Sequence, residues 1–307
     1  SKSINTNINV SLSPDVLYPP SVSHEQKDFF CLLLKLCYNV CRNLGTFMEM
    51  KVVQRDGRQT DLNIGKIRSV VEWACEGLEV NPIALESGLT AQLKDGITSK
   101  DIQENLINCA LTMCNPEEPD WRYVAGRLHI WGLWKDTRVS RKFGGYSADA
   151  VFTHHDATDF ASYVHWQVGR GVYDEQIINE YSDRELRLAS AWLKSEYDKD
   201  FDYAGATMLT SRYLRMGELP QEAFLVCALL LADGDLQLAE KLYHAIAQRK
   251  ISLATPILAN LRIPNGSLSS CFIVAVDDNL ESIFREVSNA ARISKNGGGV
   301  GVNLSRV

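Results

Sequence analysis

A strand, a helix and a second strand follow one another in residues 271–304, which read CFIVAVDDNLESIFREVSNAARISKNGGGVGVNL. β-Branched and aromatic residues fill the interval from Cys271 to Val276, and Asp277 and Asp278 are expected to end this strand. A helix is predicted from Leu280 to Lys295, and the residues after the glycines at 297–299 again read as a strand. This order of elements is typical of the beginning of a parallel α/β sheet.

A parallel sheet is normally covered on both faces, whereas this sequence stops at Val307 on one of its first strands. Two interpretations follow from the pattern alone. The sheet is completed by residues of another polypeptide, or the last strand pairs within a small self-contained sheet.

Upstream, the patterns predict a hairpin followed by four helices. Asp56-Gly57 is a tight-turn signal between two short extended pieces. The first helix is expected from Ile67 to Leu78, where apolar residues recur on one face. The other three are expected over 81–93, up to Met113, and over 120–135. Ser99 is the expected N-cap of the third helix, with Gln103 near the capping-box position.

The remaining regions are predicted to be mostly helical. Residues 1–47 read as an extended arm and one helix over 26–44, and residues 139–250 as a helical region. Within that region, helices are expected over 175–179, 183–197, 221–231 and 236–249.

Composition excludes several classes of function. The 307 residues carry a formal charge of −6, which argues against a surface for duplex nucleic acid or anionic lipid. The longest apolar run, 224–232, is too short to span a bilayer, and no secretory signal is recognisable, so a cytoplasmic location is expected. Eight cysteines without a CxxC pair, and His154-His155-Asp156 without a third ligand, predict no metal site.

Two groups of residues have chemistry that suits phosphate. Arg55, Asn63 and Lys66 lie around a hairpin and a helix start, although charge spacing alone favours a solvated face, with Asn63 as an N-cap. Thr255, Ser270 and the Cys271 thiol bracket a loop at the entry to a strand, where an ordinary loop and an inert thiol are the alternative. The glycines at 297–299 and 301 could let the backbone approach a ligand closely, and helix termination is the alternative explanation.

Three stretches resemble the large (alpha) subunit of class I ribonucleotide reductase. Residues 53–78, with Val53-Gln54-Arg55-Asp56-Gly57 and Leu62-Asn63-Ile64-Gly65-Lys66, look like the family's ATP-cone. Residues 251–271, with Ala254-Thr255-Pro256 and Ser269-Ser270-Cys271, look like its substrate-diphosphate loop and reducing cysteine. Residues 278–303, with Asp278-Asn279-Leu280 and Asn296-Gly297-Gly298-Gly299, resemble the approach to its specificity site.

The resemblance implies an α+β chain in four parts. Residues 1–47 would be an arm and helix, 48–138 the ATP-cone (a β-hairpin plus four helices), 139–250 a helical domain, and 251–307 the first strands of a ten-stranded α/β barrel. The barrel would be completed by another polypeptide, because the subunit is either split or truncated.

The resemblance also implies roles for individual residues. Cys271 would be catalytic, as one of two thiols that reduce the ribose. Substrate binding is implied for Thr255, Ser270 and Gly299. The allosteric specificity site would include Asp278, Asn279 and Leu280. Nucleotide binding in the cone is implied for Arg55, Thr60, Asn63, Lys66 and Ser99.

The implied partners are those of a complete reductase. They are the C-terminal portion of the alpha subunit, a beta subunit that holds an iron centre and a radical, thioredoxin or glutaredoxin, ribonucleoside diphosphates, and a second alpha subunit in a homodimer. No cofactor is expected on this chain alone, apart from ATP or dATP and dNTP effectors. A non-catalytic nucleotide-binding regulatory protein and part of a cobalamin-dependent reductase are the alternatives.

The cone departs from the family pattern at several positions. Gln54 replaces a lysine, Thr60 an acidic residue, Gln103 a common histidine, and Asp136 a basic residue. Fewer cations and one added carboxylate near a triphosphate predict weak nucleotide binding.

Overall fold

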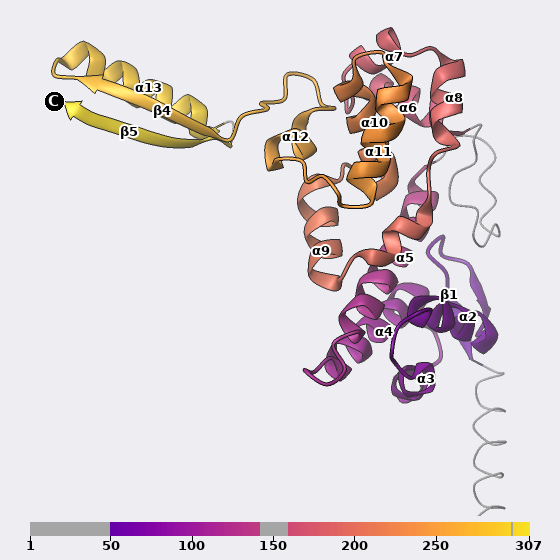
Figure 1. Cartoon of the computed structure of the whole chain (residues 1–307). Helices are drawn as coiled ribbons and strands as arrows, with labels where there is room; N and C mark the ends of the chain where they lie inside the picture. Colours follow the sequence, from indigo (N-terminus) through magenta and orange to yellow (C-terminus); the bar gives the residue numbers. More distant parts are fainter. Residues whose placement is uncertain (1–49, 142–158, 296) are drawn as a thin grey trace, which may run out of the picture.

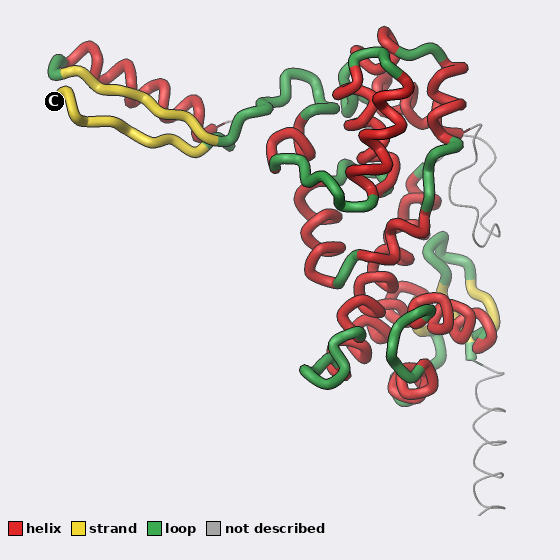
Figure 2. Tube along the Cα trace, in the orientation of Figure 1, coloured by secondary structure: helices red, strands yellow, loops and turns green. Residues whose placement is uncertain are grey.

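The computed structural model of the chain describes residues 50–141, 159–295 and 297–307 (Figure 1). Three parts follow one another along these residues: a small sheet with helices, a helical middle part, and a strand, helix and strand at the carboxyl end (Figure 2). The predicted arm and helix within residues 1–47 lie outside the described residues, as do His154, His155 and Asp156.

The first part confirms the predicted hairpin. Strands β1 (Lys51–Val53) and β2 (Gln59–Asp61) pair antiparallel, and the turn between them contains Gly57 with a φ of 84°. That dihedral favours glycine because it has no Cβ. A third strand, β3 (Ile97–Thr98), pairs parallel with β1 and was not predicted, because two residues carry no recognisable alternation.

Four helices complete this part, as predicted. They are α2 (Ile64–Cys75), α3 (Pro82–Thr90), α4 (Ser99–Met113) and α5 (Trp121–Ser140). Their apolar faces and β1 form one core that includes Val52, Val71, Leu106, Val124 and Leu128.

The predicted cap of α4 is wrong. Thr98 is the N-cap: its hydroxyl accepts from the Asp101 N–H at 2.9 Å, and the Asp101 carboxylate completes the capping box. Thr98 ends strand β3, so the chain turns from extended to helical one residue earlier than expected. Gln103 is buried and donates from its side chain to the Leu128 carbonyl.

The middle part is helical, as predicted, with more breaks. Its elements are α6 (Asp159–Gly169), α7 (Gln176–Glu180), α8 (Asp183–Ser190), the 3-10 helix η2 (Ser195–Asp200), α9 (Tyr203–Met208), the π-helical η3 (Leu209–Tyr213), α10 (Pro220–Ala232), α11 (Leu236–Ala247) and α12 (Thr255–Asn260). Helix α10 is buried along almost its whole length and forms the centre of the core.

The prediction of one helix over 183–197 is wrong. Helix α8 ends at Ser190, and tight turns carry the chain to η2. The Lys194 N–H donates to the Tyr243 hydroxyl at 3.1 Å, so a tertiary contact replaces the helical hydrogen bond there. Helices α6, α9 and α12 were not predicted.

The carboxyl-terminal part consists of β4 (Cys271–Asp277), α13 (Leu280–Lys295) and β5 (Gly299–Arg306). The two strands are parallel, with Cys271 opposite Gly299, which confirms the predicted start of an α/β sheet. Asp277 belongs to β4, one residue beyond the predicted end. This part extends away from the helical middle part, to which a loop after α12 connects it (Figure 1).

Candidate functional site

Cys271, Ser270 and Gly299 come together where β4 and β5 begin. The Gly299 N–H donates to the Ser270 carbonyl at 2.7 Å, and the Ser270 hydroxyl lies 3.5 Å from the Cys271 sulfur. The Cys271 side chain is exposed. Gly299 is exposed and has no side chain, so the backbone beside the thiol is open. The site thus presents a thiol, a hydroxyl and uncovered backbone to one side.

Thr255 is the first residue of α12 and is exposed. Its hydroxyl lies 3.2 Å from the Tyr213 hydroxyl, at the end of η3. Thr255 and Ser270 therefore have different hydrogen-bond partners. Along the chain they are separated by α12 and by the loop that joins α12 to β4. That loop is folded: the Asn260 side chain donates to the Ser267 carbonyl at 2.8 Å.

Asp278, Asn279 and Leu280 lie together at the carboxyl end of β4, and all three are exposed. Asn279 also has a structural role, because its side chain accepts from the Ser282 N–H at 2.8 Å in the first turn of α13. Next to them, Arg306 of β5 pairs with Asp277 at 3.3 Å.

In the first part of the chain, Arg55 is the residue that joins the predicted nucleotide ligands. Its side chain is 12% exposed, and its Nε lies 2.5 Å from an Asp136 carboxylate oxygen, while Nη1 lies 3.5 Å from the Ser99 hydroxyl. Three elements therefore meet here: the hairpin, the start of α4 and the later half of α5. The carboxylate of Asp136 neutralises the charge of this guanidinium.

The other predicted cone residues lie on the same hairpin and on α2. Gln54 donates to the Thr60 hydroxyl at 2.8 Å across the hairpin. Asn63 is the N-cap of α2, and its side chain accepts from the Lys66 N–H at 3.0 Å. This confirms the N-cap role that was predicted as the alternative to phosphate binding. The Lys66 side chain is exposed.

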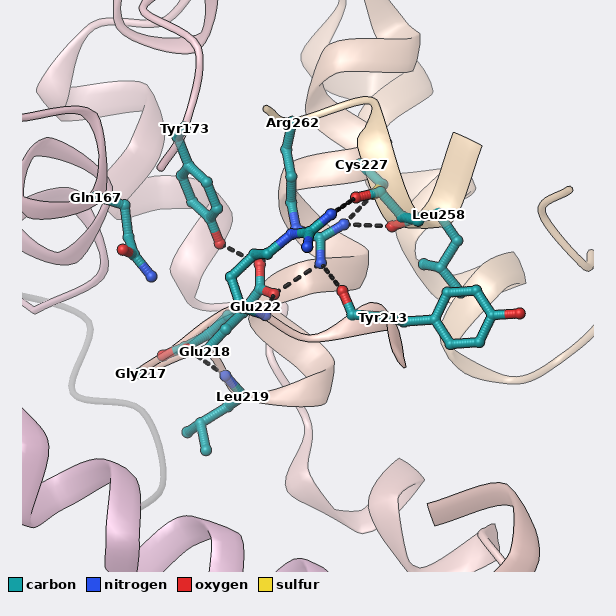
Figure 3. A network of polar contacts seen from close by, with 12 residues as sticks. Gln167, Tyr173, Tyr213, Gly217, Glu218, Leu219, Glu222, Cys227, Leu258 and Arg262 are labelled. Carbon is teal, nitrogen blue, oxygen red and sulfur yellow. Dashed lines mark hydrogen bonds and ion pairs between the residues drawn. The ribbon is translucent and has the colours of Figure 1, made fainter. Parts of the chain in front are cut away.

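A buried polar network in the middle part was missed from the sequence (Figure 3). Arg262 and Glu218 form a two-contact ion pair, with distances of 2.5 and 2.7 Å, and both side chains are 0% exposed. Arg141 and Glu222 form a second ion pair, also fully buried. Partners 44 and 81 residues apart leave no local signal, since neither lies within one turn of the other.

Two further properties concern only the described residues. Within them, no group of three His, Cys, Asp or Glu side chains could hold a metal ion. No helix in the same residues is long and apolar enough to cross a membrane.

Comparison with known proteins assigns each of the three parts. Residues 50–136 match the ATP cone domain, residues 199–266 the ribonucleotide reductase all-alpha domain, and residues 269–307 the ribonucleotide reductase barrel domain. The ribonucleoside-diphosphate reductase alpha subunit of Synechocystis sp. is 60% identical over 264 residues. The chain belongs to the ribonucleotide reductase alpha-subunit family.

Other members of the family are more distant. The alpha subunit of Enterobacteria phage T4 is 29% identical over 269 residues, and subunit alpha 1 of Escherichia coli is 30% identical over 274 residues. Each alignment covers 84% of this chain but only 33–34% of the relative. This ribonucleotide reductase chain therefore spans about a third of the length of the curated relatives it matches.

Proposed function

We propose that this chain is the amino-terminal portion of a class I ribonucleoside-diphosphate reductase alpha subunit, which reduces ribonucleoside diphosphates to deoxyribonucleoside diphosphates. The observation that carries the proposal is the exposed Cys271 thiol beside Ser270 and Gly299, within the segment that matches the barrel domain. An exposed thiol with a hydroxyl and exposed backbone beside it suits the reduction of a bound sugar.

Cys271 would supply half of the reducing power. Two thiols release two electrons and two protons and become a disulfide, while the ribose C2′–O bond breaks and the oxygen leaves as water. Hydrogen takes the place of the hydroxyl group. Thr255 and Ser270 would hold the diphosphate, because hydroxyl groups donate to phosphate oxygens. Gly299 would line the same site without a side chain, since its own N–H is bonded to the Ser270 carbonyl.

The second thiol would come from the remainder of a ten-stranded α/β barrel. Large apolar side chains on both strands and on α13 support this, since Ile273, Leu304, Phe284 and Val287 are all more than half exposed. A parallel sheet normally has both faces covered, so we infer that further barrel strands and helices cover this unit in the complete subunit.

The remaining partners are those that the resemblance to the family implies. A radical is needed to activate the ribose, so a beta subunit with an iron centre is proposed, and thioredoxin or glutaredoxin would reduce the disulfide. A homodimer of alpha subunits is also proposed. Asp278, Asn279 and Leu280 would contact a dNTP effector, and the cone would bind ATP or dATP weakly because Asp136 neutralises Arg55.

The test is reduction of CDP by purified proteins. The 307-residue chain should turn over CDP only when a polypeptide with the rest of the barrel and a beta subunit are both added. Turnover by the chain with a beta subunit alone would show that the active site does not need the rest of the barrel. A dependence on adenosylcobalamin would instead assign the chain to a cobalamin-dependent reductase.

A further inference from the structure

The Thr255 hydroxyl has a specific partner in the helical part of the chain. It lies 3.2 Å from the hydroxyl of Tyr213, which is half-buried and is the last residue of η3. A threonine hydroxyl rotates with χ1 among staggered positions, and a fixed partner selects one of them.

Tyr213 is itself fixed by the buried Arg262. The guanidinium Nη2 of Arg262 donates to the Tyr213 carbonyl at 2.6 Å, and Nη1 donates to the Leu258 carbonyl within α12 (Figure 3). One side chain therefore holds both the end of η3 and the helix that begins with Thr255. Arg215 adds a second link, from its Nη2 to the Ala259 carbonyl at 2.6 Å.

Glu218 keeps this guanidinium in place. Its carboxylate forms the two-contact ion pair with Arg262 and accepts two further hydrogen bonds, from the Tyr173 hydroxyl and from the Arg215 N–H at 2.7 Å. A buried ion pair keeps its geometry only where its remaining polar atoms are also satisfied, and these contacts meet that condition. The network therefore fixes the backbone at Tyr213 relative to α12, the helix that begins with Thr255.

We propose that Tyr213 is a positioning residue that orients the Thr255 hydroxyl toward the substrate diphosphate. The inference rests on the proposed function, in which Thr255 binds that diphosphate. An ionised phosphate oxygen only accepts, so Thr255 must use its single proton to donate to it. Its oxygen is then free to accept from the Tyr213 hydroxyl, and the two hydrogen bonds strengthen each other.

The experiment is a double-mutant cycle in the complete alpha subunit, assayed with its beta subunit. Tyr213→Phe keeps the ring and removes the hydroxyl, and we expect the KM for CDP to rise about 3- to 10-fold with kcat unchanged. Thr255→Ala should raise KM at least as much, and adding Tyr213→Phe to it should change nothing further. The matched control is Tyr197→Phe, which removes a hydroxyl bonded to His244 and Gln248 and should leave KM unchanged.

The outcomes separate the two proposals. If Thr255→Ala leaves the KM unchanged, Thr255 does not bind the diphosphate, and the proposed role of Thr255 and this inference both fall. If Thr255→Ala raises the KM but Tyr213→Phe does not, or if the two effects multiply, only the positioning role is wrong. Thermal unfolding of each variant monitors the fold. A rise in KM that correlates with a lowered melting temperature, and not with loss of the Tyr213 hydroxyl, would also overturn the inference.

Discussion

Burial separates the thiols of the described residues into two groups. Burial raises the pKa of Cys75 and of Cys227 to about 11, and it also raises the pKa of Cys109. Such thiols stay protonated at neutral pH and act as small apolar side chains. Cys114 and Cys271 are exposed, and of these two only Cys271 lies beside Ser270, one of the predicted diphosphate ligands.

Replacing Cys271 with serine therefore tests its redox role. In the complete reductase, Cys271→Ser should abolish multiple turnover supported by thioredoxin or glutaredoxin, because serine cannot form the disulfide. Binding of CDP, measured by equilibrium titration, should change by less than about twofold, since serine nearly preserves the volume of the side chain. Cys114→Ser is the matched control and should retain the full steady-state rate. A Cys271→Ser enzyme with an unchanged rate would assign this thiol to the inert group.

The pairing of Arg55 with Asp136 makes a second prediction at this scale. Asp136→Asn removes the carboxylate charge, so the guanidinium becomes available to a phosphate. We expect the dissociation constant of dATP for the 307-residue chain to fall by about 10-fold, the equivalent of one charge-assisted hydrogen bond. Isothermal titration calorimetry measures it.

The control for this change is Glu240→Gln. It alters the net charge equally, on helix α11 of the middle part, and should leave dATP binding unchanged. Tight, submicromolar dATP binding by the unmodified chain would contradict the argument, because it would mean that Asp136 does not obstruct the site.

Among the elements, α4 offers a test of how a helix start is specified. Thr98→Ala removes the hydroxyl that caps the Asp101 N–H, and we expect it to lower the free energy of unfolding by about 1 kcal/mol. Ser99→Ala changes the first residue inside the helix and should have a smaller effect. Urea unfolding of both variants gives the comparison. A larger loss from Ser99→Ala would restore Ser99 as the cap.

The sequence predicted long, regular elements better than short ones. Helix α13 was predicted from Leu280 to Lys295 as observed, because its sixteen residues present a continuous pattern between strong boundary signals. Strand β3 has two residues, and α9 and α12 have six each, so their patterns are too short to read. The break after Ser190 depends on a contact with Tyr243, 49 residues away from Lys194.

The candidate site was predictable to a similar degree. The motif around Cys271 identified a thiol, a hydroxyl and a glycine that the parallel pairing of β4 with β5 brings together. The family pattern also identified Asp136 as a carboxylate at a position that is basic in the family. The sequence could not predict that Asp136 binds Arg55, or that Tyr213 contacts Thr255, because these partners are 81 and 42 residues apart.

At the scale of the whole molecule, the first two parts share an interface. Arg127 of α5 is buried and donates to the carbonyls of Ala74 and Glu76 at the end of α2, and to the Lys199 carbonyl in η2. Lys199 also pairs with Glu76, and Trp134 donates to Asp198 at 3.1 Å. The cone and the helical part are thus packed together, whereas β4, α13 and β5 keep large apolar side chains exposed.

The exposed apolar surface of β4, α13 and β5 predicts that other parts of the reductase complete the effector site there. Asp278, Asn279 and Leu280 offer a carboxylate, an amide and an apolar surface to a nucleoside. Two cations described near this end of β4 already have carboxylate partners, because Arg306 pairs with Asp277 and Arg285 pairs with Glu286. Triphosphate binding needs charge-assisted contacts, which we expect from the rest of the barrel.

The 307-residue chain should therefore bind dTTP at least about 100-fold more weakly than the complete alpha subunit, the equivalent of about two such contacts. Calorimetric titration of both proteins measures the ratio. In the complete subunit, Asp278→Ala should weaken dTTP binding and leave the effector-free KM for CDP unchanged. Equal dTTP affinities for the chain and the complete subunit would mean that the whole specificity site lies within these 307 residues.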